Sequence, residues 1–209
     1  FAVDASLETF QQAAEAGCQM IIVHHGMLWN FSKYYLTGTN YEKVKMLMGN
    51  NLALYAAHLP LDKHSIYGNN IQLAKLLGLQ NIQPFGSHHE TPIGFIGEKP
   101  TTLKEVKNLL DKNKIQTLTL PFGKEKIKTI ALISGGAAKE VEEAIAKKAD
   151  LYITGEPMHH VYHQAKEAEI NVIFGGHYET EVWGVKALMP LLKEKFKVKV
   201  EFIDIPTLI

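Results

Sequence analysis

A strand, a helix and a second strand follow one another twice along this chain, at nearly the same spacing. Near the N-terminus, "FAVDAS" (1–6) is typical of the end of a strand, and "SLETFQQAAEAG" (6–17) and "QMIIV" (19–23) continue as helix and apolar strand. In the second half, the corresponding segments are strand "IALISGG" (130–136), helix "AAKEVEEAIAKKA" (137–149) and strand "DLYIT" (150–154). Strands that alternate with helices predict an α/β fold with mostly parallel sheets.

Both copies continue with a helix and a third apolar strand that ends in histidine. These segments are "YEKVKMLMGNN" (41–51) with "LALYAAH" (52–58), and "HHVYHQAKEAEI" (159–170) with "NVIFGGH" (171–177). We therefore predict two related α/β units from an internal duplication, each a mostly parallel or mixed sheet flanked by helices. Segment 81–100, rich in proline and glycine, is expected to form loops around a short strand and to contain the boundary, so the units cover 1–90 and 91–209.

The C-terminal part adds one more helix and one more strand. The pattern of 180–196 predicts a helix that Pro190 bends or divides, because proline lacks the N–H that a helix interior needs. The segment "KVKVEFIDIP" (197–206) predicts a last strand, which the first unit can share.

Two adjacent histidines, His24 and His25, end the strand of the first copy. Neighbouring residues of a strand point to opposite faces, so both imidazoles can serve one centre only where the strand gives way to a loop. Gly26 makes that departure easy. Functional sites of parallel sheets lie beyond the carboxyl ends of the strands, where this pair stands.

Two further motifs combine an imidazole with a carboxylate. In "HLPLD", Pro60 argues against a regular helix, so a loop is expected to turn His58 and Asp62 inward together. In "HYETE", a spacing of four puts His177 and Glu181 on one face of a beginning helix.

Together these motifs offer four imidazoles and two carboxylates, the ligand set of a two-metal site in which ions lie roughly 3.5 to 4 Å apart. The alternative for each histidine alone is an ordinary hydrogen-bonded residue at the end of a strand. Equivalent positions in two copies, each with a carboxylate, favour metal ligation. Mixed imidazole and carboxylate ligands suit zinc, iron, manganese, cobalt or nickel.

Other residues near these strand ends are candidates for catalysis or substrate binding. Glu156 is either a capping carboxylate or a catalytic base, and His160 either a polar residue at the start of a helix or a carrier of protons. Gly135 and Gly136 stand between a strand and a helix, where backbone amides can hold an anion, although a plain tight turn explains them equally well.

The composition narrows the classes of partner. The 22 basic and 22 acidic residues balance, and every basic residue is lysine, which argues against reading of nucleic acid by arginine. The single cysteine, Cys18, fits a reducing cytoplasm, and the sequence offers no long apolar stretch for a membrane span. Since "FAVDAS" begins within a strand, we expect the natural chain to start before Phe1.

The motifs "IIVHHGMLW", "HLPLDKHSIYGNNIQLAKLLGL", "DLYITGE" and "GGHYETE" resemble the Nif-three-like dinuclear metal-centre family, whose members are often named GTP cyclohydrolase I type-two-like proteins. The likeness covers nearly the whole chain and is that of the short form, without an inserted domain. It implies a metal site between the two units, two divalent ions per subunit and a ring-shaped homohexamer, a toroid. By motif, the implied metal ligands are His24, His25, His58, Asp62, His177 and Glu181. Because family members carry a further segment before the first strand, we expect the first unit to be incomplete here.

The resemblance also implies a hydrolase reaction, a GTP cyclohydrolase activity in which hydroxide attacks carbon 8 of guanine, formate leaves and a pterin forms. A site of this kind equally suits the hydrolysis of phosphoesters or amides. A non-enzymatic alternative is a metal-binding hexamer that acts as a scaffold or regulator.

Overall fold

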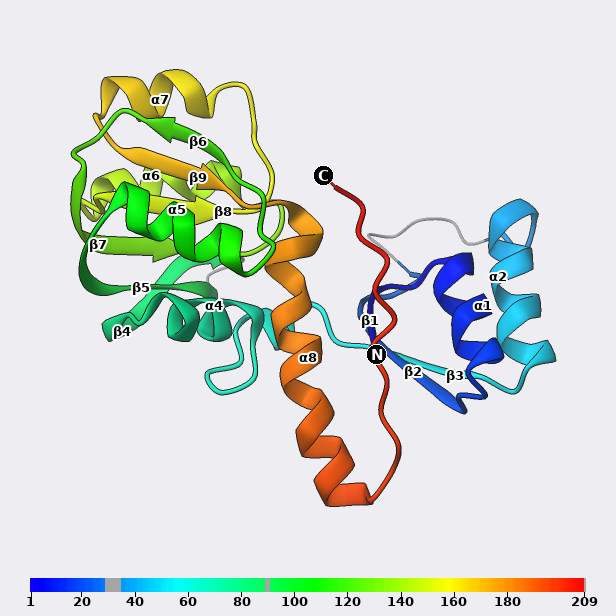
Figure 1. Ribbon diagram of the computed structural model, residues 1–209. Helices are drawn as coiled ribbons and strands as arrows, with labels where there is room; N and C mark the ends of the chain where they lie inside the picture. The colour runs from blue at the N-terminus through cyan, green and yellow to red at the C-terminus, as the bar shows by residue number, and fades with distance from the viewer. Residues whose placement is uncertain (29–34, 89–90, 209) are drawn as a thin grey trace. The chain divides into compact units, whose positions relative to one another are not determined.

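The computed structural model describes residues 1–28, 35–88 and 91–208 (Figure 1). Contacts divide the chain into two units: the first holds Phe1–Leu61 and Val185–Ile205, and the second holds Asp62–Gly184 and the residues after 205. This division differs from the expected boundary at residue 90. Residues 69–88 belong to the second unit because Ile71 and Leu73 are part of its core and residues 80–88 pair within its sheet.

The first unit contains a three-stranded parallel sheet in the order β1-β2-β3. Its elements in chain order are β1 (Ala2–Asp4), α1 (Leu7–Glu15), β2 (Met20–His25), α2 (Gly38–Gly49), β3 (Ala53–Ala56) and the short α3 (Leu59–Asp62), which ends at the first residue of the second unit. Ser6 caps α1 by accepting a hydrogen bond from the amide of Thr9. Phe10 of α1 is fully buried against the sheet residues Ile21 and Val23.

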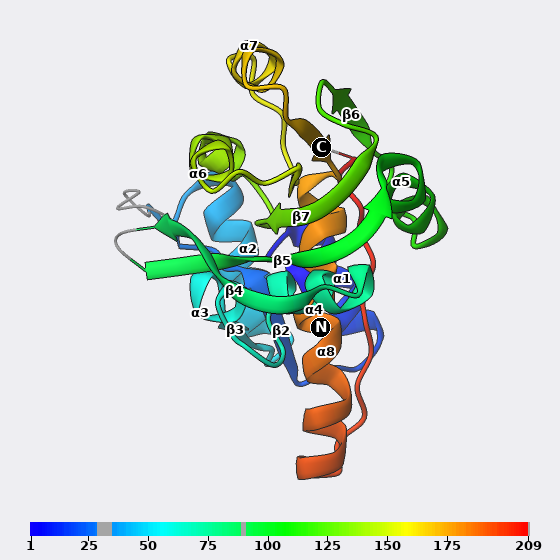
Figure 2. The ribbon, with the colours of Figure 1, turned by 90° about the vertical axis from the view of Figure 1, so that its left-hand side faces the viewer.

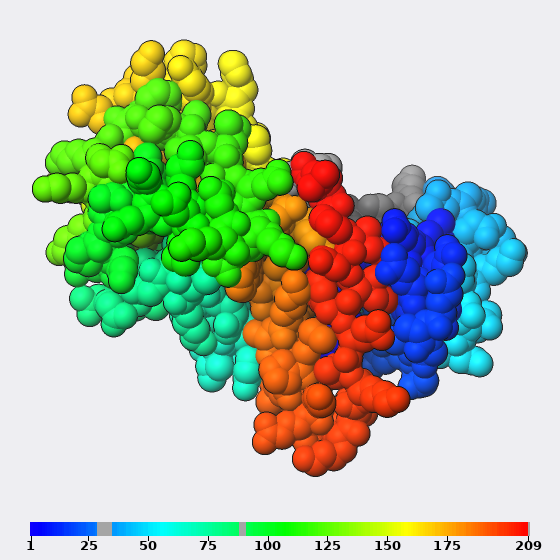
Figure 3. All heavy atoms as spheres, in the orientation of Figure 1, coloured from blue at the N-terminus to red at the C-terminus, as the bar shows by residue number. Residues whose placement is uncertain are grey.

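The segment expected as the last strand, 197–206, is described throughout and has no regular strand. It nevertheless lies along the N-terminus, since the Ile203 amide donates to the Phe1 carbonyl at 2.8 Å and the Phe1 amino group to the Glu201 carbonyl at 2.7 Å. Figure 3 shows the red segment beside the blue one. Ile203 is buried in the core of the first unit, so this segment is indeed shared with that unit, but as an extended segment with too few backbone bonds to extend the sheet.

The second unit contains a six-stranded mixed sheet in the order β4-β5-β7-β8-β9-β6. Its elements are α4 (Asn69–Leu77), β4 (Gln80–His88), β5 (Thr91–Thr102), α5 (Leu103–Lys112), β6 (Leu118–Pro121), β7 (Lys126–Leu132), the 3-10 turn η1 (Ala138–Glu140), α6 (Val141–Ala146), β8 (Leu151–Thr154), α7 (Val161–Glu167), β9 (Asn171–Phe174) and α8 (His177–Phe196), whose last twelve residues belong to the first unit. Strands β7, β8 and β9 are parallel neighbours joined through helices, like β1, β2 and β3. The predicted repetition of one α/β arrangement is therefore present.

Helices cover both faces of this sheet. Ile130 and Leu132 of β7 pack in one core cluster with residues of α4 and α5. Ala131, between them, is fully buried and points to the opposite face, because side chains alternate along a strand. Figure 2 shows α5 and α6 on opposite sides of the strands. Burial on both faces explains the continuous apolar runs of β7, β8 and β9.

Segment 81–100 forms most of a long antiparallel hairpin, β4 with β5, so the expectation of loops around one short strand was wrong. Pro84 is tolerated because β4 is an edge strand, and Pro100 lies where the register of β5 shifts. An added Cβ at Gly94 would overlap the Leu132 carbonyl oxygen of β7. The residues that suggested loops are therefore those that an edge strand, a bulge and close strand contact require.

Two prolines are accommodated within helices, against expectation. Pro60 is the second residue of α3, where the missing N–H has no helical acceptor to bond, so "HLPLD" is a helical turn rather than a loop. α8 runs through Pro190 without a break. Pro190 and Lys186, whose carbonyl loses its helical partner, are both exposed, so water can bond that carbonyl. Within the described residues, no helix has the combination of length and apolar character that a membrane span requires.

Candidate metal centre

In the first unit, three histidines gather at the carboxyl ends of β2 and β3. His24 and His25 end β2, and His58 follows β3 by two residues. The ring centroids are 4.7 Å apart for His24 and His25, 5.0 Å for His24 and His58, and 5.3 Å for His25 and His58. One ring nitrogen from each lies within 4.8 Å of the other two, so the three imidazoles are close enough to hold a metal ion.

Two of these imidazoles are anchored through Nδ1. His24 Nδ1 lies 2.9 Å from the carbonyl oxygen of Ala57, and His25 Nδ1 lies 2.7 Å from Oδ1 of Asp4. Both partners are acceptors, so Nδ1 carries the proton in each ring. Such anchoring fixes the tautomer and makes Nε2 the nitrogen that binds a metal.

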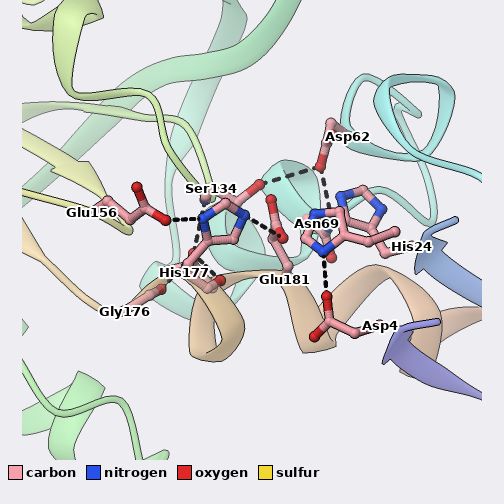
Figure 4. Close-up of polar contacts among 12 residues, drawn as sticks. Asp4, His24, Asp62, Asn69, Ser134, Glu156, Gly176, His177 and Glu181 are labelled. Atoms are coloured by element: carbon pink, nitrogen blue, oxygen red, sulfur yellow. Dashed lines mark hydrogen bonds and ion pairs between the residues drawn. The ribbon is translucent and has the colours of Figure 1, made fainter. Parts of the chain in front are cut away.

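In the second unit, His177 lies between two carboxylates in the first turn of α8 (Figure 4). Its Nδ1 is 2.5 Å from Oε1 of Glu156, and its Nε2 is 3.0 Å from Oε2 of Glu181. Burial lowers the pKa of His177, but the hydrogen bonds and charges of Glu181 and Glu156 outweigh burial and raise the pKa to about 9. The expected pairing of His177 with Glu181 across one helical turn is present as an ion pair.

A buried polar network holds Asp62 at the end of α3. Asp62 is 5% exposed, and its Oδ1 accepts hydrogen bonds from Asn69 Nδ2 at 2.9 Å and from Ser134 Oγ at 3.3 Å. Asn69 Oδ1 in turn accepts from the Gly184 amide of α8 at 2.6 Å. Asn70 bonds the carbonyl of Asp62 and the amide of Ser134. The carboxylate is therefore fixed from α4, from the end of β7 and, through Asn69, from α8.

Gly135 allows the chain to approach Glu181 closely. It has φ +67°, and an added Cβ would overlap Oε1 of Glu181 and lie 3.1 Å from Nε2 of His177. Its amide donates to Oγ1 of Thr180 at 2.9 Å, so this amide is already used within the fold. Gly136 is exposed and close to Glu156, which leaves it as the better placed of the two predicted substrate-binding glycines.

The histidines of the α7 region stand apart from this chemistry. His160 is the N-terminal cap position of α7, is exposed, and its side chain makes no hydrogen bond to the residues that the structure describes. His159 and His163 are also exposed, with ring centroids 6.5 Å apart. Glu156 has a contact to a predicted ligand, and His160 has none among the described residues.

Several polar residues contact candidate ligands but have no ligand pattern in the sequence. Asp4 lies at the end of β1, and Asn69 and Asn70 open α4; each bonds a candidate ligand. Asp4 stands at a strand end like the histidines, which is the one signal in the sequence. The sequence gives no sign of a role for the other three residues beyond their polar side chains; they are Asn69, Asn70 and Ser134, and all are buried in the structure.

The donor chemistry of the first unit fits a divalent metal ion. The Nδ1 anchors of His24 and His25 leave Nε2 of each ring for a ligand role, and the second unit offers the ion-paired His177 and Glu181 and the buried Asp62 as further nitrogen and oxygen donors. Buried carboxylates are costly unless hydrogen bonds, ion pairs or metals compensate them. Soft thiolate ligands are absent from both sets, which favours ions that prefer nitrogen and oxygen.

Comparison with known proteins then decides the family. The model of the Duf34/NIF3 (NGG1p interacting factor 3) family matches residues 1–207. The chain belongs to the Duf34/NIF3 family. The resemblance inferred from the histidine motifs is thereby confirmed.

Relatives in the NIF3 family share sequence and fold over almost the whole chain. A Pyrococcus horikoshii protein named GTP cyclohydrolase 1 type 2 homolog is 46% identical, with 99% of this chain and 84% of that protein covered. An Archaeoglobus fulgidus protein of the same name is 42% identical, with coverage of 99% and 83%. Among solved structures, protein ybgI, described as of unknown function, has a TM-score of 0.92 at 32% identity, covering 100% of this chain and 84% of that one. TTHA1606 from Thermus thermophilus has a TM-score of 0.91 at 36% identity, with coverage of 99% and 82%.

Proposed function

We propose that the protein is a dinuclear metal-dependent hydrolase that converts GTP to dihydroneopterin triphosphate and formate. The observation that carries the proposal is the group of three imidazoles, His24, His25 and His58, whose nitrogens lie within 4.8 Å of one another. The arrangement of these side chains supports the proposed metal binding. The names of the relatives support GTP as the proposed substrate.

Six side chains would hold two divalent ions, of zinc, iron, manganese, cobalt or nickel. They are His24, His25, His58, Asp62, His177 and Glu181. Four neutral imidazoles and two carboxylates supply two negative charges, so the loaded centre keeps an excess of positive charge. Such a centre attracts anions, which suits a triphosphate substrate.

When bound, such ions supply hydroxide at working pH, because zinc lowers the pKa of water to about 7. The chain's own residues hold and move protons around this chemistry. Glu156 holds the Nδ1 proton of His177 with Oε1, while its side chain, 40% exposed, can exchange a proton with solvent. His160, exposed at the start of α7, is the second proton carrier, and Gly136 is the exposed backbone position for substrate contact. Overall one water is consumed as carbon 8 of guanine leaves as formate.

We also propose a cytoplasmic homohexamer in the form of a toroid. The first unit supports assembly, because α2 has no buried residue among those described and Met48 is 75% exposed. Tyr55 on the edge strand β3 is 56% exposed. Exposed apolar side chains on neighbouring elements are typical of protein contact surfaces. Light scattering coupled to gel filtration measures the subunit number.

The test of the activity uses protein of measured metal content, incubated with GTP and assayed for formate and for pterin fluorescence. His24→Ala and Glu181→Gln should lose both products, whereas Glu179→Gln, a carboxylate in the same turn of α8, should retain them. Absence of product from fully loaded wild-type protein would refute GTP cyclohydrolysis. Product that persists in both ligand variants after metal removal would refute the metal mechanism.

The same experiment separates the alternatives. Two bound ions without turnover of GTP or of general phosphoester and amide substrates would favour a metal-binding hexameric scaffold or regulator. Hydrolysis of a phosphoester or an amide but not of GTP would keep the dimetal hydrolase and change its substrate.

A further inference from the structure

We infer that Asp4 is a positioning residue for the metal centre: its carboxylate orients His25 and strengthens Nε2 of that ring as a metal ligand. The inference rests on the proposed metal site of the first unit and does not depend on the hydrolase reaction. It concerns a residue outside the six proposed ligands.

The pairing of β1 with β2 places the two side chains together. Asp4 is the register partner of His25 across the parallel strands. Asp4 Oδ1 lies 2.7 Å from Nδ1 of His25, a distance typical of a charge-assisted hydrogen bond. The His25 side chain is 14% exposed and the Asp4 side chain 38%, so the contact is shielded on the side of the imidazole.

The backbone of Asp4 is held on both sides of the residue. Its carbonyl accepts from Oγ1 of Thr9 at 2.8 Å, which ties it to the first turn of α1. The next amide, that of Ala5, donates to the His25 carbonyl at 3.0 Å. The carboxylate therefore faces His25 from a fixed main chain, so little conformational freedom is lost when it bonds the ring.

A comparison of His25 with its neighbour His24 shows what a carboxylate partner adds to a histidine ligand. His24 is anchored by a neutral carbonyl, that of Ala57, whereas His25 is anchored by a charged group. Both acceptors fix the tautomer, but only the carboxylate also pushes electron density toward Nε2 and places a negative charge one ring away from a bound cation. Because the three imidazoles carry no negative charge of their own, Asp4 compensates part of the charge that an ion would bring.

An ordinary surface ion pair is the competing explanation, and it predicts a different result. An exposed pair contributes little to folding, and as a surface contact it has no effect on metal affinity. A carboxylate that supports a metal-bound histidine changes metal affinity by about 10- to 100-fold when it is removed. Metal affinity and protein stability therefore separate the two explanations.

The test compares wild-type protein with Asp4→Ala, Asp4→Asn and the control Glu8→Gln, an exposed carboxylate of α1. Metal-free proteins are titrated with Co²⁺ against a chromophoric chelator, with the visible absorption of Co²⁺ as a readout of the ligand geometry. Asp4→Ala should weaken Co²⁺ binding by about 10- to 100-fold, and Asp4→Asn, which keeps the acceptor but not the charge, by less. Glu8→Gln should match wild type. In the loaded protein, the exchange of the His25 Nδ1 proton with water, followed by NMR, should accelerate in Asp4→Ala.

Each other result overturns the inference. Wild-type affinity in Asp4→Ala would show that Asp4 has no part in metal binding, and an equal loss in Glu8→Gln would show a general effect of charge. If wild-type protein binds no Co²⁺, the metal centre itself fails and the role of Asp4 fails with it. If Asp4→Ala does not fold, Asp4→Asn at wild-type affinity and wild-type exchange rate would still refute the role.

Discussion

The two units present their potential ligands in different states. In the first unit, a carbonyl holds Nδ1 of His24 and a carboxylate holds Nδ1 of His25. In the second unit, His177 is ion-paired with Glu181, and the pKa of His177 is raised to about 9, with burial opposing and the two carboxylates causing the rise. At neutral pH, His177 must therefore release a proton before it can bind a cation.

This difference shows that one arrangement of strands and helices can hold its candidate ligands in two ways. Parallel strands direct the ligands of both units to the carboxyl ends of the strands. The first unit adds backbone and aspartate anchors at that edge. The second adds a helix start, where a carboxylate and an imidazole four residues apart meet. The shared topology determines where the candidate ligands lie, and the residues around each ligand determine its electrostatic environment.

The largest expected effect comes from Glu181, the carboxylate that is ion-paired with His177. Glu181→Gln removes the charged ligand and lowers metal affinity by about two orders of magnitude or more, because second-sphere changes alone cost about 10- to 100-fold. Metal content by mass spectrometry and GTP-dependent formate release both measure the loss. Glu179→Gln in the same turn is the matched control, and an equal loss there would contradict a specific role of Glu181.

The substitution Gly135→Ala tests the close contact between Gly135 and Glu181 in the second unit. Gly135→Ala should destabilise the protein by about 1–2 kcal/mol through the left-handed backbone, and further through overlap with Glu181. Gly17→Ala is the control, since Gly17 has φ +66° but no atom within 4 Å of an added Cβ. Denaturant unfolding gives the difference, and metal content should fall only for Gly135→Ala. Equal losses of stability and unchanged metal content would contradict the contact.

The ion pair of His177 with Glu181 predicts that the stability of the protein depends on pH. A folded-state pKa of about 9 for His177, above its ordinary 6.5, contributes stability that is complete below pH 6.5 and is lost as pH rises through about 9. In metal-free protein the loss should amount to no more than about 3 kcal/mol. Unfolding free energies of wild type and Glu181→Gln, measured across this range, isolate the contribution of the pair. A parallel pH dependence in the two proteins would contradict it.

Metal binding should show the opposite trend with pH. An ion that takes His177 as ligand displaces its proton, so metal affinity rises as the pH approaches about 9. Calorimetry in buffers of different ionisation enthalpy counts the protons released. No release near neutral pH would show that the metal does not use His177.

The ligands could be predicted from the sequence because they stand at strand ends in a repeated pattern. Their supports could not, because Asp4 reaches His25 only through the register of β1 and β2, and Asn69 reaches Asp62 only after α4 packs. The α/β class followed from periodicity. The β4–β5 hairpin was missed because its prolines and glycines have the composition of a loop, and only the edge position and the close contact with β7 explain them.

The smallest expected effect concerns the hydroxyl that supports Asp62. Ser134→Ala removes a donor 3.3 Å from Oδ1 while Asn69, at 2.9 Å, remains, so we expect a loss of about 1 kcal/mol in stability and about a two- to threefold weaker metal affinity. Ser87→Ala, an exposed serine of β4, is the control for the substitution itself. Unfolding and Co²⁺ titration measure both quantities. A loss of metal affinity as large as that of Glu181→Gln would mean that the Ser134 hydroxyl, rather than the Asn69 amide, holds the Asp62 carboxylate. The main support of Asp62 would then come from the end of β7 instead of from α4.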